Sequence, residues 1–271
     1  MAMRLLMTFF SLLMMGCASS SYIRVSDIPY VEDGHARQSG DLYLPRGEGP
    51  WPTIILLHGG GWIRRDRSDM ARKARRLARA GFAVYNAGYR LAPEYRFPAQ
   101  LEDVYAAQRA LRALANDYPV LPERSALMGY SAGGHLALLA AARPGPDTPV
   151  LLAVISGSGP TDVSVYPRSP YLIPFIGGTP DEKPYEYFAA SPRNFVTSAH
   201  PPAFLYHGRR DRLVEVEQSR DHFAVLQATG VPSEYHEFRF QGHFGVYLFN
   251  RRPMQASIRF LKEHLVLPFA E

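Results

Sequence analysis

A serine set among small residues near the middle of the chain is the first candidate for chemistry. Residues 129–133 read Gly-Tyr-Ser-Ala-Gly, so that Ser131 has a glycine two positions away on each side, between a predicted strand ending near Met128 and a predicted helix. A strand-to-helix turn this tight has room only for glycine at the flanking positions and pushes the serine hydroxyl clear of the sheet. The spacing therefore predicts a nucleophilic serine, although turn glycines and a helix-capping serine would give the same pentapeptide.

A second glycine cluster follows an earlier strand. Residues 58–62 read His-Gly-Gly-Gly-Trp and come directly after residues 53–57, a continuous apolar run typical of a strand buried on both faces. Consecutive glycines cost conformational entropy on folding, so an ordinary loop has little use for them here. The N–H groups of Gly60 and Gly61 can approach a substrate closely, and the N–H of Ala132 lies at a predicted helix N-terminus. We expect these three N–H groups to form an oxyanion hole.

A serine hydroxyl near neutral pH needs a base to accept its proton and an acid to orient that base. When the serine lies on such a turn, these partners come later in the chain, the acid before the histidine. Asp211 follows a strand predicted over residues 203–206 and fits the acid. His243 follows a strand predicted over residues 234–240 and fits the base. Asp162 and Asp221 remain alternative acids.

The other histidines considered as bases have structural interpretations. The chain contains nine histidines, which makes elimination necessary. His207 ends a predicted strand and His236 lies inside one, while His222 and His264 lie on predicted helices. These positions leave His243 as the preferred base.

No metal or cofactor is indicated. The sequence has no His-Glu-x-x-His pattern, no paired cysteines and no carboxylate cluster with the spacing of a calcium loop. Neither a G-x-x-x-x-G-K loop nor a G-x-G-x-x-G loop follows a predicted strand. We therefore expect chemistry that uses side chains and backbone groups alone.

These candidate groups must be positioned by a regular framework. An alternation of strands and helices predicts an α/β domain over residues 40–268, with a mostly parallel central sheet and helices on both faces. The predicted strands cover residues 41–45, 53–57, 83–88, 125–128, 150–155, 203–206 and 234–240, and the predicted helices cover residues 68–80, 99–118, 135–142, 215–228 and 254–265.

One long connection interrupts this alternation. Residues 157–202 are rich in proline and aromatic residues and have no clean period, apart from a short helix predicted over residues 185–190. A connection this long in a compact domain is usually functional, so we expect a lid or a binding wall. Trp62, Tyr130 and the aromatic residues of 166–175 are candidate substrate contacts.

Composition and charge describe an ordinary globular protein. Of 271 residues, 46% are hydrophobic and 20% are charged, and the formal net charge is +5. The densest basic run, residues 72–79, has apolar residues at helical spacing and is interpreted as the solvent-exposed face of a helix. No nucleic-acid partner is therefore expected, and the oligomeric state is left open.

The N-terminal segment has the pattern of an export signal. Arg4 precedes an apolar run over residues 5–15, which is too short to span a bilayer and is followed by Gly16 and Cys17, the only cysteine. Residues 1–17 resemble a bacterial lipoprotein signal in which Cys17 is acylated, although Met14 replaces the usual leucine. We expect a cell-envelope lipoprotein with a tether over residues 18–39. A plain signal peptide, giving a periplasmic or secreted protein, and an apolar N-terminal helix of a cytosolic protein are the alternatives.

Several motifs together resemble one superfamily. His-Gly-Gly-Gly-Trp at residues 58–62, G-Y-R-L-A-P-E-Y-R-F-P-A-Q-L-E-D-V at residues 88–104, G-Y-S-A-G-G-H at residues 129–135, H-G-R-R-D at residues 207–211 and G-H-F at residues 242–244 look like the α/β hydrolases. Over residues 40–266 the chain is similar to HGGG-type serine esterases of the hormone-sensitive-lipase kind. It is closer to the acetyl-ester and feruloyl-esterase-like branch that includes arylformamidases.

This resemblance implies a serine esterase without a cofactor. Ser131, Asp211 and His243 would be the catalytic triad, with Gly60, Gly61 and Ala132 as oxyanion donors. The stretch between Cys17 and His58 is too short for the helical N-terminal cap of many HGGG lipases, so small-molecule esters with short acyl chains are the expected substrates. An amide hydrolase of arylformamidase type and a non-catalytic binding protein of the cell envelope are the alternatives. Residues 88–104 are expected to be structural, with Glu102 or Asp103 capping and bracing the following helix.

Overall fold

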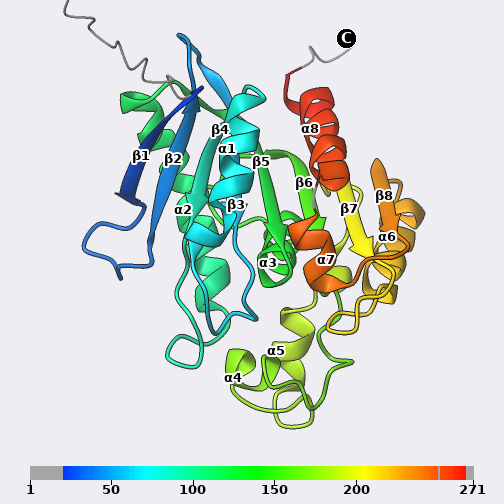
Figure 1. The fold of residues 1–271 in the computed structure, drawn as a ribbon. Coiled ribbons are helices and arrows are strands. Elements are labelled where there is room, and N and C mark those ends of the chain that lie inside the picture. Colours follow the sequence, from blue (N-terminus) through cyan, green and yellow to red (C-terminus); the bar gives the residue numbers. More distant parts are fainter. Residues whose placement is uncertain (1–20, 250, 267–271) are drawn as a thin grey trace, which may run out of the picture.

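The computed structural model describes residues 21–249 and 251–266, and the predicted signal and Cys17 lie outside these residues. A single eight-stranded sheet runs through the molecule in the order β1-β2-β4-β3-β5-β6-β7-β8 (Figure 1). β1 and β2 are antiparallel to their neighbours, and β3 to β8 are parallel to one another. The strands are β1 (Tyr22–Pro29), β2 (Ser39–Pro45), β3 (Trp51–Leu57), β4 (Ala83–Ala87), β5 (Val120–Tyr130), β6 (Leu151–Gly157), β7 (Ala203–Gly208) and β8 (Ser233–Phe238).

Helices cover both faces of this sheet, as predicted. α1 (Ala71–Arg79), α7 (His243–Leu248) and α8 (Arg251–Leu265) contribute to one apolar cluster, and α2 (Ala99–Asp117), α3 (Ala132–Ala142) and α6 (Glu217–Ala228) to the other. Residues 54–57 of β3 are almost completely buried because both of their faces are covered. The predicted α/β architecture is therefore confirmed, and it brings the carboxyl ends of the parallel strands to one edge of the sheet.

The prediction of a tether over residues 18–39 is wrong for residues 22–29, which form β1. Tyr22–Pro29 pairs with β2 in antiparallel register, from Tyr22 opposite Pro45 to Pro29 opposite Ser39. Arg24 on β1 donates to Asp41 on β2 at 2.9 Å. The side chains of β1 are half-buried or exposed, so the segment lacks the apolar pattern that marks a strand in sequence. Pairing with a neighbouring strand supplies its stability instead.

The connection over residues 157–202 is a packed wall at the carboxyl edge of the sheet. It contains α4 (Leu172–Ile176), α5 (Pro184–Ala189) and a 3-10 turn, η2 (Pro192–Phe195), which Figure 1 shows beyond the strand ends. Leu172, Phe175 and Tyr187 are buried in the same apolar cluster as α2 and α3. This segment is therefore anchored to the core by its own side chains.

The motif at residues 88–104 is braced by one carboxylate. Asp103 is 1% exposed, and it accepts hydrogen bonds from the Arg90 backbone N–H and from Gln38 Nε2, each at 2.7 Å. The expected cap is wrong, because α2 begins after Pro98 and no side chain caps it. Asp103 therefore braces the loop against α2.

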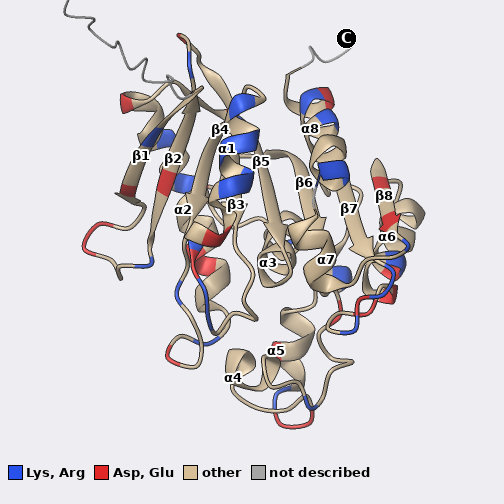
Figure 2. Cartoon of the chain, in the orientation of Figure 1, with Lys and Arg blue, Asp and Glu red and all other residues tan. Residues whose placement is uncertain are grey.

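The basic run over residues 72–79 forms most of α1, and Figure 2 shows its blue segments along that helix. Arg72 and Arg79 are exposed as expected, but Lys73 is buried. Its Nζ lies 3.5 Å from the ring centroid of Tyr247 on α7, and burial lowers the pKa of Lys73 to about 7. The solvent-face interpretation is therefore wrong for Lys73, because α7 packs over it. Among residues 21–249 and 251–266, no helix combines the length and apolar character needed to cross a bilayer.

Candidate active site

Ser131 lies on a sharp turn between β5 and α3. Its φ of 54° and ψ of −122° lie outside the regions that non-glycine residues favour, at a cost of roughly 1–3 kcal/mol. A Cβ at Gly129 would lie 2.1 Å from the Gly133 carbonyl oxygen, so the turn closes only if that position is glycine. The Ser131 N–H donates to the Gly157 carbonyl at 2.7 Å. The surrounding backbone thus holds the strained serine in place.

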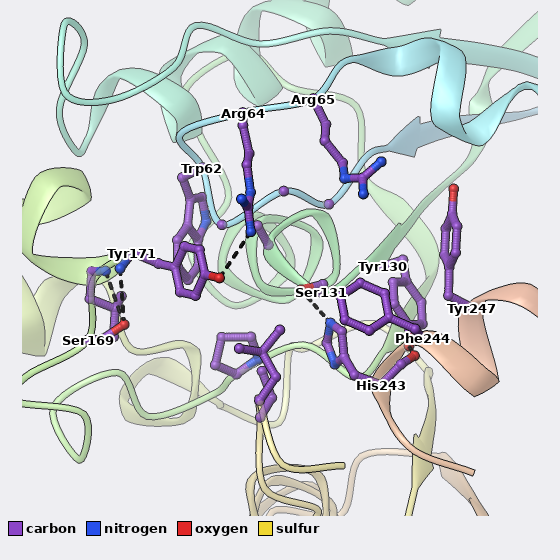
Figure 3. Close-up of a pocket in the computed structure, with 18 of the residues that line it drawn as sticks. Trp62, Arg64, Arg65, Tyr130, Ser131, Ser169, Tyr171, His243, Phe244 and Tyr247 are labelled. Carbon is purple, nitrogen blue, oxygen red and sulfur yellow. Dashed lines mark hydrogen bonds between the residues drawn. The ribbon is translucent and has the colours of Figure 1, made fainter.

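Three loops at the carboxyl edge bring a serine, a histidine and an aspartate together. Ser131 Oγ lies 3.0 Å from His243 Nε2, and His243 Nδ1 lies 2.6 Å from Asp211 Oδ2. These residues follow β5, β8 and β7 respectively, and His243 is the first residue of α7. Figure 3 shows the bond between Ser131 and His243. The arrangement can move a proton from Ser131 Oγ to His243 while Asp211 orients the imidazole.

Asp211 is held as an ionised acceptor. Its Oδ1 accepts from the N–H groups of Leu213 and Val214 at 2.9 and 3.0 Å, and its side chain is fully buried. Burial alone would raise the pKa of Asp211. The hydrogen bonds from His207 and His243 outweigh this effect, so the pKa lies well below its ordinary value. The carboxylate therefore stays charged and keeps the proton of neutral His243 on Nδ1.

His207 is a second histidine beside this carboxylate. Its Nε2 lies 2.9 Å from the Val214 carbonyl and 3.3 Å from Asp211 Oδ2. Because a carbonyl can only accept, Nε2 carries the hydrogen, and Nδ1 accepts from Ser219 Oγ at 2.7 Å. His207 is at a strand end, as predicted, but its contact with Asp211 was not predicted.

The alternative acids lie elsewhere. Asp162 pairs with Arg193 at 3.3 Å and accepts from Ser164, while Asp221 is exposed on α6. Among the described residues, Asp211 is the only carboxylate that pairs with His243. The geometry therefore favours Asp211.

Backbone N–H groups gather beside Ser131. Gly60 and Gly61 have φ angles of 119° and 62°, and within the described part of the chain their N–H groups donate to no protein acceptor. Ala132 is the first residue of α3, so its N–H has no acceptor within the helix. All three residues line the same cleft as Ser131. The cluster can stabilise a negative oxygen formed next to the serine.

The loop before these glycines is fixed by a neutral histidine. His58 is stacked on Tyr89, with ring centroids 4.2 Å apart and an angle of 6° between the rings. Burial lowers the pKa of His58 to about 4, and its Nδ1 lies 2.6 Å from the Gly59 carbonyl, to which it donates. The ring stack and this hydrogen bond therefore anchor the loop without a buried charge.

The cleft over Ser131 has several aromatic residues in its walls. Trp62 lines it but is 3% exposed, because its ring is stacked on Phe175 and its Nε1 donates to His135 Nδ1 at 3.3 Å. Tyr130 also lines the cleft, and its hydroxyl donates to the His243 carbonyl. Both predicted contacts thus face the cleft with their rings, while their polar atoms donate hydrogen bonds to other residues of the protein.

Several lining residues were absent from the sequence prediction. They include Arg64, Arg65, Asp69, Leu213, Phe244 and Tyr247, of which Figure 3 labels Arg64, Arg65, Phe244 and Tyr247. The two arginines directly follow the glycine loop and the phenylalanine follows His243, so their neighbours in sequence were a usable signal. No group of three or more histidine, cysteine, aspartate or glutamate residues able to hold a metal occurs within residues 21–249 and 251–266.

Comparison with known proteins places this geometry among esterases. Residues 41–226 match the BD-FAE family. The chain is 32% identical over 197 residues to esterase LipC of Mycobacterium tuberculosis, an overlap of 66% of this chain and 49% of LipC. The chain spans about half the length of these curated mycobacterial relatives, between 49% and 57%.

Solved structures extend the similarity to nearly the whole chain. A truncated carbohydrate esterase from gut microbiota superimposes with a TM-score of 0.84 at 26% identity, covering 92% of this chain and 99% of that protein. An acetyl ester-xyloside bifunctional hydrolase from Caldicellulosiruptor lactoaceticus superimposes with a TM-score of 0.75 at 25% identity, covering 88% and 96%.

Proposed function

Because the chain belongs to the BD-FAE family of α/β hydrolases, we propose that it hydrolyses carboxylic esters through an acyl-enzyme on Ser131. The observation that carries this proposal is the hydrogen-bonded series from Asp211 through His243 to Ser131, beside three N–H groups that can receive an oxyanion. The names of the relatives, among them esterases and a carbohydrate esterase, support the same activity.

The proposed reaction has two halves. Ser131 Oγ attacks the ester carbonyl carbon while His243 Nε2 takes the hydroxyl proton, and Asp211 stabilises the resulting imidazolium. The carbonyl oxygen becomes negative and is held by the N–H groups of Gly60, Gly61 and Ala132. His243 then gives its proton to the leaving alcohol. Water attacks the acyl-enzyme through the same steps, releasing the acid and restoring Ser131.

We infer that the preferred acyl chains are short. The buried Trp62–Phe175 stack and the core-anchored α4 form one side of the cleft, so this side cannot readily move aside for a long chain. In a p-nitrophenyl ester series from acetate to palmitate, we expect kcat/KM to be highest at acetate or butyrate. We expect kcat/KM to fall at least about tenfold by decanoate, because one methylene too many for a hydrophobic pocket lowers kcat/KM by about 10- to 200-fold.

The same assay distinguishes esters from amides. The butyryl anilide matched to the preferred ester should be cleaved much more slowly, and faster cleavage of the anilide would replace the esterase with an amide hydrolase of arylformamidase type. An optimum at decanoate or longer would contradict the short-chain assignment.

We further propose that the protein is exported and attached to the bacterial cell envelope by acylation of Cys17. The support is the charged, apolar and small-residue pattern of residues 1–17. Radiolabelled palmitate fed to expressing bacteria should label the protein, and Cys17→Ser should lose the label while Ser131→Ala keeps it. Label that persists in Cys17→Ser would overturn the anchor and leave a plain signal peptide or a cytosolic protein.

A further inference from the structure

Two arginines lie at the cleft directly after the oxyanion loop. Arg64 and Arg65 are exposed and line the cleft that contains Ser131. Figure 3 shows both side chains extending from the loop, with Arg64 hydrogen-bonded to Tyr171. The reaction proposed above uses neither guanidinium, although both lie within the same cleft as the nucleophile.

Arg64 is held in a defined position. Its Nη2 donates to Tyr171 Oη at 3.0 Å, and its Cζ lies 5.3 Å from the centroid of that ring. The Tyr171 ring packs on the oxyanion loop so closely that a Cβ at Gly61 would lie 2.5 Å from Tyr171 Cδ1. A Cβ at Gly60 would lie 2.1 Å from the Arg64 carbonyl oxygen, so the Arg64 backbone is also packed against this loop. A guanidinium positioned in advance loses less entropy when it binds a ligand.

Among the described residues, no carboxylate near the cleft forms an ion pair with Arg64. Asp69 is the one carboxylate among the described lining residues, and it pairs with Arg65 at 3.3 Å. Glu215, near the rim, accepts from Tyr166 Oη at 2.6 Å. Within the described residues, Arg64 forms no ion pair, and one of its five N–H donors is used, by Tyr171. Of the two arginines that line the cleft, Arg65 is therefore paired with a carboxylate and Arg64 is not.

We propose that Arg64 binds a carboxylate carried by the ester substrate, so that the protein prefers acidic esters. This inference rests on the proposed esterase function and specifies its substrate class. The planar guanidinium of Arg64 matches the two oxygens of a carboxylate and can donate two parallel hydrogen bonds to them. The carboxylate belongs to the acyl part or to the alcohol part of the ester, since Arg64 and Ser131 share one continuous cleft.

Two pairs of substrates test this preference and separate the two parts. In the acyl pair, the p-nitrophenyl monoester of adipate is compared with the corresponding adipamate, which has a neutral amide in place of the carboxylate. In the alcohol pair, 3-acetoxybenzoate is compared with 3-acetoxybenzamide. For each pair, the ratio of kcat/KM for the acidic ester to kcat/KM for the neutral ester is measured in the wild type, Arg64→Gln, Arg64→Lys and Arg112→Gln.

We expect the wild type to prefer the acidic ester about tenfold or more in at least one pair, and Arg64→Gln to lower that ratio about 10- to 100-fold, the range for a hydrogen bond to a charged group. The loss should be mainly in KM, and Arg64→Lys should fall between the wild type and Arg64→Gln. Arg112, an exposed arginine on α2 that donates to the Asp147 carbonyl, is the matched control, and Arg112→Gln should leave both ratios unchanged.

Wild-type ratios below about two in both pairs would overturn the inference, as would an Arg64→Gln variant that slows the acidic and neutral esters by the same factor. Those results would leave the esterase function standing, because the neutral esters would still be hydrolysed. Absence of turnover for all four substrates would instead contradict the proposed function, and the inference would fall with it.

Discussion

Replacing Ser131 by alanine is expected to lower kcat for p-nitrophenyl acetate by about 10⁴-fold or more, the scale found when a triad nucleophile is removed. Ser131 Oγ is the hydroxyl that lies 3.0 Å from His243 Nε2, and the variant leaves no other oxygen in its place. Alanine is smaller than serine, so it fits the same turn without a new clash. Steady-state kinetics on purified wild type and variant, with circular dichroism to verify the fold, measure the loss.

A double variant of Ser131 and His243 is the control for this result, because the effects of two residues that act as a unit do not add. The double variant Ser131→Ala/His243→Ala should be no slower than Ser131→Ala alone, because a base without its nucleophile contributes little. A fluorophosphonate probe should label the wild type and fail to label Ser131→Ala. If the wild type is neither active nor labelled while its fold is intact, the protein is a non-catalytic hydrolase-fold protein. If Ser131→Ala keeps more than a tenth of the activity, the nucleophile is a different group.

Replacing Asp211 by asparagine is expected to lower kcat by about 10²- to 10⁴-fold. The carboxylate accepts from His243 Nδ1 at 2.6 Å and also faces His207 Nε2 at 3.3 Å. A neutral amide can no longer stabilise the imidazolium, and its NH₂ group can turn toward Nδ1 and favour the wrong tautomer of His243. The backbone N–H groups of Leu213 and Val214 can still donate to the amide oxygen, so the loop should keep its shape.

Asp162→Asn is the matched control for this prediction. Asp162 is paired with Arg193 and does not contact His243, so its variant should keep kcat within about threefold and lose at most about 1 kcal/mol of stability with the ion pair. Thermal unfolding of both variants separates a kinetic loss from a folding defect. A larger loss in Asp162→Asn than in Asp211→Asn, with both proteins folded, would move the acid to Asp162.

Features carried by short stretches could be predicted from the sequence. The strand at residues 53–57 is a continuous apolar run, and such runs are buried on both faces. The turn around Ser131 depends on glycine at residues two positions away, and this requirement is visible in five letters. Asp211 and His243 follow from the order of partners that such a turn implies. Local backbone geometry and strand periodicity act within a few residues, which is why these predictions needed no coordinates.

Contacts between distant parts of the chain were decided only by the tertiary structure. β1 is held by pairing with β2, since its own side chains lack an apolar face. Lys73 lies on a basic helix face and is buried only because α7 packs over it. Arg64 meets Tyr171 across a separation of 107 residues, which no sequence periodicity encodes. Local residue patterns were enough to predict the parallel strands and the reacting groups, because these patterns act within a few residues. The packing of distant segments fixed β1 and set which charges are paired, buried or left facing the cleft.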